Sequence, residues 1–365
     1  GAFFGWHPWL YLVLVPAAIG LRGNIFGSFG NRISTSIHAG TFRGSLRREA
    51  VLGQNVLAAM LLTMGMSLAL AVVAKAVAVG LGLENSIDLL SMATVSIIGG
   101  VLGSVVVLAA SLGLTAGAVR YGWDLDNVTA PLVSTLGDVL TLPALYLATF
   151  LLGISIVTSV VGLALVAASL ASLVAGWRSS TEGLRRIVHE SVPVLLVAGC
   201  VSAGAGITLE RSFARFEALP ALLVLVPAHL SSSGALGGIL SGRLASKLFL
   251  GLVTPASSPN REARRDISLV FLLAVPVYLF NGIGAHAVAR LLGQASPGLG
   301  QMVMVSLIGG ALAILFVVAV AFYGTVAAYR TGVDPDTYGI PVISSSVDLV
   351  GAFTLTIAIS LLGLS

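Results

Sequence analysis

Two aspartates occupy equivalent positions inside long apolar stretches in the two halves of this 365-residue chain. Asp138 lies in PLVSTLGDVLTLP and Asp348 in PVISSSVDLVGAF. An ionisable side chain at membrane depth is costly, so it marks a functional position by default. Hydroxyl residues precede both aspartates, namely Ser134, Thr135, Ser344 and Ser345.

The chemistry of this pattern is that of a hard cation site. Carboxylate, hydroxyl and carbonyl oxygens suit Mg²⁺, or a similar cation that keeps much of its water. We therefore predict that the two aspartates and the hydroxyl residues before them bind such an ion. The alternative is that each aspartate caps a broken helix or bonds a neighbouring helix.

Two Asp-x-Asp pairs open the last apolar stretch of each half, Asp124 with Asp126 and Asp334 with Asp336. A carboxylate at this place favourably meets the positive end of a helix dipole, which is the capping interpretation. The functional interpretation is that the pairs concentrate cations at the inner mouth of a pathway.

Proline and clustered glycine interrupt the apolar stretches at 16–40 and 227–251. We expect the helix to break there, and open backbone at membrane depth often marks a transport site; a kink that serves packing is the alternative. The expected break residues are Pro16, Gly23, Gly27, Pro227, Gly234 and Gly238.

The same two stretches contain four cations. They are Arg22, Arg32, Arg243 and Lys247. We expect most of them to extend towards the cytoplasm or to pair with acids. They are also the basis for a second hypothesis, an anion or organic-solute carrier.

The composition excludes most other classes of protein. Hydrophobic residues make up 57% of the chain and charged residues 9%, against roughly 25% charged residues in soluble domains. A soluble enzyme, a nucleic-acid-binding domain and a disordered chain are thereby excluded, despite a net charge of +4. No GxxxxGK[ST] phosphate-binding loop occurs, so we expect neither ATP-driven pumping by this chain nor enzymatic activity.

Ten apolar stretches approach or exceed the roughly 20 residues that span a bilayer. They lie near 8–40, 50–80, 88–118, 128–153, 154–177, 191–209, 218–250, 267–292, 298–329 and 337–364. We therefore expect an all-α, multi-pass protein of the cell membrane, in contact with the lipid bilayer. Arg43, Arg47 and Arg48 help to place the loop after the first span in the cytoplasm.

The chain repeats itself at an offset of 211, which becomes 210 towards the end of each half. LVLVPA at 12–17 recurs at 223–228, and Asp138 corresponds to Asp348. Repeats of this length are typical of membrane carriers. We predict a first repeat at 1–153, a linking helix and loop at 154–190 and a second repeat at 191–365, oriented in parallel. The counterpart of 191–209 is expected before residue 1.

The segments PAAIGLRGNIFG, DLDNVTAPLVSTLGDVLTL and VDPDTYGIPVISSSVDLVG resemble the membrane domain of the MgtE family of magnesium channels and transporters. The tandem arrangement resembles the two-domain solute-carrier relatives of that family. The resemblance implies that Asp138 and Asp348 correspond to the pore aspartate and that Asn24 belongs to the Gly-Asn element of the family. The second repeat has Ala235 in place of that asparagine.

The leading hypothesis is a channel or transporter for Mg²⁺, or for divalent cations more broadly, with its pore between the two repeats. Its partners are the bilayer and the transported ion, and no nucleic acid is expected. One chain supplies both halves of the pore; a homodimer or a cytosolic regulatory partner is the alternative. A membrane subunit that only scaffolds a partner is a third hypothesis.

Overall fold

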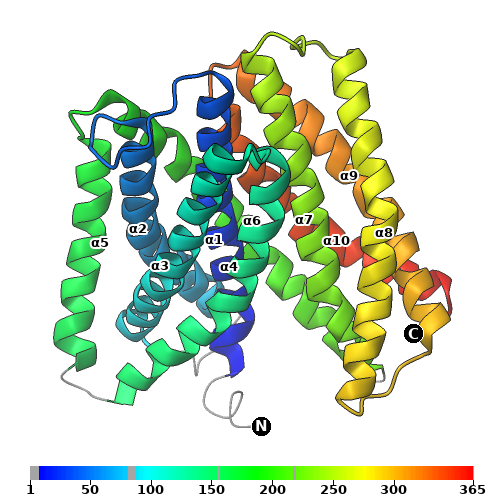
Figure 1. The fold of residues 1–365 in the computed structure, drawn as a ribbon. Coiled ribbons are helices and arrows are strands. Elements are labelled where there is room, and N and C mark those ends of the chain that lie inside the picture. The colour runs from blue at the N-terminus through cyan, green and yellow to red at the C-terminus, as the bar shows by residue number, and fades with distance from the viewer. Residues whose placement is uncertain (1–7, 81–86, 154–156, 217–218, 365) are drawn as a thin grey trace.

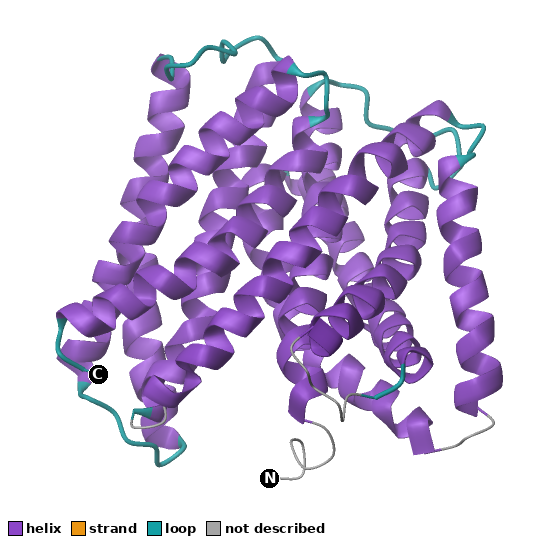
Figure 2. Cartoon of the chain, turned by 180° about the vertical axis from the view of Figure 1, so that it is seen from behind, coloured by secondary structure: helices purple, strands orange, loops and turns teal. Residues whose placement is uncertain are grey.

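The computed structural model describes residues 8–80, 87–153, 157–216 and 219–364. These ranges form a bundle of helices and contain no strand, and the loops gather at its two ends (Figures 1 and 2). The α-helices are α1 (Pro8–His38), α2 (Val51–Gly80), α3 (Leu89–Tyr121), α4 (Leu125–Thr149), α5 (Gly162–Trp177), α6 (Glu182–Phe216), α7 (Pro220–Phe249), α8 (Arg261–Leu291), α9 (Leu299–Arg330) and α10 (Pro335–Leu361). Two short segments, a 3₁₀ turn at Phe150–Gly153 and a π-helical turn at Val157–Val161, lead into α5.

Each predicted span corresponds to one of these helices, so the all-α prediction is confirmed. Eight of the helices in the described ranges are long and apolar enough to cross a membrane. The chain is therefore a multi-pass membrane protein. Large apolar side chains such as Leu272 and Phe280 of α8 are exposed on the outside of the bundle, where lipid rather than water surrounds them.

The predicted helix breaks are wrong. Both α1 and α7 are continuous helices, through Pro16, Gly23 and Gly27 in α1 and through Pro227, Gly234 and Gly238 in α7. One lost backbone hydrogen bond at a proline is tolerated in a membrane helix whose neighbours hold it in place.

At least one of the expected break glycines serves close packing instead. A side chain on Gly27 would collide with Ile340 of α10. Small residues at such contacts let two membrane helices approach closely.

The two repeats share one internal architecture. In the first, α1 packs on α2, α3 and α4; in the second, α7 packs on α8, α9 and α10. Gly40 and Gly251, equivalent in the repeat, end α1 and α7 with positive φ of 69° and 71°. The hydroxyl of Ser96 donates to the backbone carbonyl of residue 67 over 2.7 Å, and that of Ser306 donates to the carbonyl of residue 278 over 2.7 Å. At these positions the structure reproduces the sequence duplication.

The repeat also supplies a matched stability prediction. A side chain on Gly310 would collide with the ring of Tyr278, which is fully buried. The equivalent Gly100 faces the hydroxyl of Ser67, which can rotate away. We expect Gly310→Ala to lower the free energy of unfolding by about 1–3 kcal/mol, and Gly100→Ala to lower it by clearly less. Denaturant unfolding in detergent measures both, and equal losses would contradict the packing shown here.

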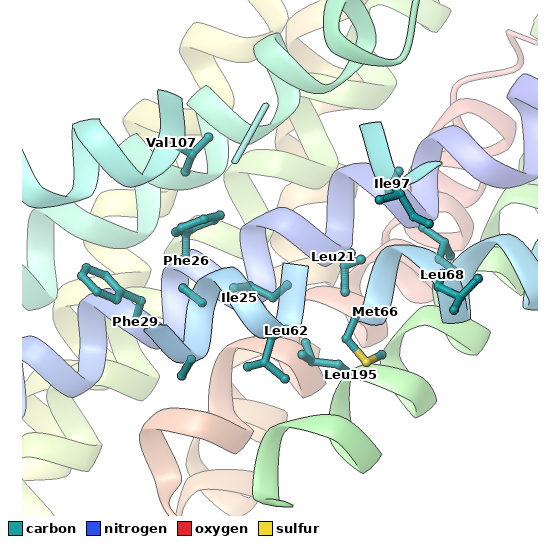
Figure 3. Close-up of a cluster of buried hydrophobic side chains, with 14 of the residues drawn as sticks. Leu21, Ile25, Phe26, Phe29, Leu62, Met66, Leu68, Ile97, Val107 and Leu195 are labelled. Atoms are coloured by element: carbon teal, nitrogen blue, oxygen red, sulfur yellow. The ribbon is translucent and has the colours of Figure 1, made fainter. Parts of the chain in front are cut away.

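A buried apolar cluster joins the first repeat to α6. Figure 3 shows Phe26 and Phe29 of α1, Leu62 and Met66 of α2, and Leu195 of α6 within it. The second repeat has apolar clusters of its own among α7 to α10. Because α6 packs on α1, α2 and α10, it contacts both repeats, whereas α5 lies at the edge of the bundle against α2 and α3 (Figure 1).

Candidate functional site

The two repeats meet around a pseudo-two-fold axis between α1 and α7. The hydroxyls of Thr35 and Ser246 are 3.3 Å apart, and these residues are separated by 211 positions, the offset of the repeat. Equivalent residues can touch only at a symmetry axis. Asn31 and Gly242, also equivalent, face each other at the same crossing, since a Cβ on Gly242 would lie 3.0 Å from Oδ1 of Asn31. The C-terminal ends of α1 and α7 therefore converge on the axis, and the repeats run in parallel.

The last helix of each repeat packs against α1 or α7 of the other repeat. α10 lies along α1, and α4 lies along α7. Four helices, α1, α4, α7 and α10, thus surround the axis (Figure 1). These are the helices that contain the predicted site residues.

Arg32 of α1 is the first of two equivalent arginines that join the repeats. Its Nε donates to Oδ1 of Asn55 over 2.6 Å, 23 residues along the chain. Its Nη1 donates to the hydroxyl of Thr337 over 3.0 Å. Arg32 therefore connects α1 both to α2 and to α10 of the other repeat.

Arg243 of α7 makes the corresponding contacts in the second repeat. Its Nε donates to Oδ1 of Asp266 over 2.9 Å, again 23 residues along the chain. Its Nη1 donates to Oδ1 of Asn127 of α4 over 3.1 Å and to the carboxylate of Asp124 over 3.3 Å. Lys247 also pairs with Asp266, at 2.7 Å. The pairing of Arg243 and Lys247 with acids is as predicted.

Asp348 lies where α10 meets α1 and α6. Its Oδ2 accepts a hydrogen bond from the hydroxyl of Ser202 over 2.7 Å. A Cβ on Gly20 of α1 would lie 3.6 Å from the same oxygen. The aspartate thus bonds a neighbouring helix, the alternative raised from the sequence, and it does so beside the first helix of the opposite repeat.

The structure does not describe the side chains of four other predicted site residues. They are Asp138, Ser134, Asp126 and Asp336. The backbone of α4 next to Asp138 passes close to α1, because a Cβ on Gly137 would lie 3.7 Å from the amide nitrogen of Gly23.

The predicted hydroxyl ligands that the structure describes differ in environment. Ser345 donates to the carbonyl of Pro341 on its own helix over 2.7 Å. Thr135 is exposed and Ser344 is half-buried. Among the described residues, no three His, Cys, Asp or Glu side chains gather as they would around a bare metal ion.

Asn24 of α1 carries an unsatisfied oxygen. The residue is 2% exposed, and Oδ1 has no hydrogen-bond partner within the described part of the chain. A buried polar atom without a partner is costly and calls for an explanation. An amide oxygen is also an ordinary ligand for Mg²⁺ and Ca²⁺, so Asn24 fits the predicted cation site.

Of the acidic pairs at the starts of α4 and α10, Asp124 and the backbone of Asp334 contact other helices. Asp124 bonds Arg243, as described, and accepts from the side-chain amide of Asn127 over 2.8 Å. The amide N–H of Asp334 donates to Oε2 of Glu190 of α6 over 3.0 Å, so α6 helps to cap the start of α10. Glu190 in turn pairs with Arg186 at 2.8 Å.

Several residues of this region escaped the sequence interpretation. The sequence around four of them has no distinctive pattern, namely around Asn31, Asn55, Asp266 and Glu190. The offset of 211 is the signal that could have found two of them, because it relates Asn55 to Asp266. The contact of Asn31 with Gly242 depends on where the axis passes, which the sequence does not give.

Comparison with known proteins identifies the family. The MgtE family, described as a divalent cation transporter, matches twice, at residues 15–148 and 226–358. Solute carrier family 41 member 3 of Mus musculus is 22% identical over 95% of this chain and 74% of its own length. Solute carrier family 41 member 2 of Homo sapiens is 23% identical over 96% of this chain, which spans only 64% of that protein. No solved structure matches. Because the two matches fall within the two repeats and cover most of the sequence, the chain belongs to the MgtE family of divalent cation transporters, in its tandem form.

Proposed function

We propose that the chain transports Mg²⁺, or divalent cations more broadly, along a pathway at the interface of its two repeats. The observation that carries this proposal is the contact of Thr35 with Ser246, because it locates the pseudo-two-fold axis between α1 and α7. In a two-fold protein that conducts one ion at a time, the axis is the place where both halves can contribute equivalent ligands.

The aspartates of the last helices supply the negative charge. Asp348 is held by Ser202 beside α1, and Asp138 occupies the equivalent position in α4. Mg²⁺ gives up its water reluctantly, so carboxylates and amide oxygens that bind the hydrated ion lower the barrier to entry. Asn24 adds an amide oxygen in the first repeat alone, because Ala235 replaces it in the second.

The crossing of α1 and α7 acts as the closed gate of the pathway. Asn31, Thr35, Gly242 and Ser246 are packed together at the axis, at the end that the basic loops predict to be cytoplasmic. A hydrated ion does not pass between helices in van der Waals contact. Opening therefore requires the C-terminal ends of α1 and α7 to separate. For a doubly charged ion, the membrane potential supplies about 4.6 kcal/mol per 100 mV towards entry.

We prefer the cation proposal to an anion or organic-solute carrier because most of the basic residues in α1 and α7 are bonded to other helices. Arg243 and Lys247 are paired with Asp266, and Arg32 is bonded to Asn55 and Thr337. Three of the four cations that motivated the alternative are thus occupied in holding helices together.

A reversible cross-link across the axis tests the pathway. In a Cys200→Ser background, which removes the single native thiol, Thr35→Cys and Ser246→Cys would place two thiols where hydroxyls now lie 3.3 Å apart. We expect the reduced protein in liposomes to admit Mg²⁺, detected by an enclosed indicator dye. Oxidation should abolish that flux, and reduction should restore it.

The two single-cysteine variants are the controls, and neither should respond to oxidant. Electrophoretic mobility confirms the cross-link independently of flux. A protein that is fully cross-linked yet transports Mg²⁺ at its reduced rate would refute a gate at this crossing. Reduced protein that admits no divalent cation would refute the function.

A further inference from the structure

Arg22 is the fourth cation of α1 and α7, and it differs from the other three in the bonding of its buried nitrogen atoms. Its side chain is 3% exposed in the middle of α1. One amino group, Nη2, donates to the carbonyl oxygen of Gly99 of α3. Nε and Nη1 are buried and have no hydrogen-bond partner among the side chains and backbone that the structure describes. Burial of an unpaired charge is among the most costly arrangements in a protein, and a guanidinium does not escape it by losing a proton.

A small cavity adjoins this guanidinium among α1, α2 and α3. It has room for a particle about the size of a water molecule. Its polar lining consists of Arg22 and four hydroxyl side chains, those of Thr63, Ser67, Ser96 and Ser104. No acidic side chain of the described residues lines it.

The hydroxyls are arranged so that hydrogen-bond donors remain. Thr63 donates to the oxygen of Ser104 over 3.3 Å, so Ser104 still has a proton of its own to donate. The absence of a side chain at Gly103 makes the site possible, because a Cβ there would collide with Nη1 of Arg22. Cationic and hydroxyl donors therefore face one small space.

The second repeat shows what the same place looks like without a charge. The equivalents of Arg22 and Ser67 are Ser233 and Tyr278. Their hydroxyls bond each other over 2.6 Å and satisfy each other. The first repeat has exchanged this neutral pair for a cation and a cavity. In the first repeat the charge adjoins an empty volume, as expected if something of opposite charge occupies the cavity.

We propose that this cavity binds one small monovalent inorganic anion, chloride in physiological media, as the counter-ion of Arg22. Water could accept hydrogen bonds from Nε and Nη1, but it would leave the charge in place. An anion held by Arg22 and Ser104 satisfies the donors and neutralises the guanidinium at once. It also removes a fixed positive charge from a wall of the protein that contains the proposed cation ligand Asn24.

Chloride binding to the purified full chain tests the site in the absence of Mg²⁺. We expect radioactive chloride to bind saturably at one site per chain in equilibrium dialysis against gluconate. Fluoride and bromide should compete, whereas thiocyanate and sulfate should not, because the cavity admits only small particles. Chloride should also raise the melting temperature relative to gluconate at equal ionic strength. The proposal is overturned if wild-type protein shows no saturable chloride binding. It is also overturned if thiocyanate competes more strongly than the other anions.

Variants assign the binding to this cavity. Arg22→Gln should abolish chloride binding, while Arg120→Gln, at the exposed C-terminal end of α3, should leave it unchanged. Should Arg22→Gln fail to fold, Ser104→Ala and Gly103→Ala keep the arginine. We expect Ser104→Ala to weaken binding about tenfold, the value of one hydrogen bond to a charged partner, and Gly103→Ala to weaken it further.

Two further outcomes would overturn the assignment of chloride as the counter-ion of Arg22. Unchanged affinity in both Ser104→Ala and Gly103→Ala would show that chloride binds outside this cavity. Binding that emerges only after Asp138→Asn would show that a carboxylate already serves as the counter-charge. Because no step of the measurement involves Mg²⁺ or flux, failure here leaves the proposed transport function untouched.

Discussion

Replacing both Asp138 and Asp348 by asparagine is expected to reduce Mg²⁺ flux into liposomes by at least about a hundredfold. Each substitution removes one charged ligand, and a hydrogen bond to a charged group contributes roughly 1.5–3 kcal/mol. Two such losses therefore amount to several kcal/mol at the point where the hydrated ion must bind. The fold should survive, because the Oδ1 of an asparagine at position 348 can still accept the hydrogen bond from Ser202.

Conservative and single variants sharpen this test. Asp138→Glu with Asp348→Glu keeps both charges and should retain measurable flux. Each single Asn variant should lie between the wild type and the double variant. Ser202→Ala removes the hydrogen bond to Asp348 but leaves its charge, so it should reduce flux far less than Asp348→Asn. Unchanged flux in the double Asn variant would reject the role proposed for the two carboxylates.

Asp266→Asn is expected to give the second large effect, on stability. The carboxylate is 3% exposed and pairs with Arg243 at 2.9 Å and Lys247 at 2.7 Å. Removal of one member of a buried ion pair leaves the remaining charge without its partner, which costs about 3 kcal/mol or more. We therefore expect the free energy of unfolding in detergent to fall by about 3 kcal/mol.

The first repeat provides the matched control for this variant. There, Asn55 stands in place of Asp266, and Ser36 stands in place of Lys247. Asp266→Asn combined with Lys247→Ser copies that arrangement and should regain much of the lost stability. Glu262→Gln, which alters a partly exposed pair at 3.6 Å, should cost less than about 1 kcal/mol. A double variant as unstable as Asp266→Asn alone would contradict the ion-pair explanation.

The helices of this protein could be predicted because each apolar stretch is long and carries few charges. The internal offset also predicted parallel repeats. Thr35 and Ser246 meet at the axis, and α1 and α7 run in the same direction (Figure 1). The prediction of helix breaks at proline and glycine in α1 and α7 was wrong. These residues favour breaks in isolation, but packing against neighbouring helices decides the backbone conformation at membrane depth.

The partners of buried side chains could not be predicted from sequence. Arg32 and Arg243 looked alike, yet one bonds an amide and the other a carboxylate, because the residue 23 positions later differs. The sequence does not show that two nitrogen atoms of Arg22 lack a partner among the described residues, since that depends on how α2 and α3 pack around it. The placement of Asp348 beside α1 follows from contact between repeats, which no local pattern encodes.

The packing of α10 on α1 and of α4 on α7 has a consequence for the origin of the protein. The final helix of each half packs on a helix of the other half. In a single ancestral unit, the helix face that makes this contact would have been uncovered. Such a unit is complete only when two copies associate, and its integrity then varies with protein concentration. Joining the copies in one polypeptide makes their association intramolecular, so each half meets the other at a high effective concentration. Once joined, the halves were free to differ, as Asn55 and Asp266 do.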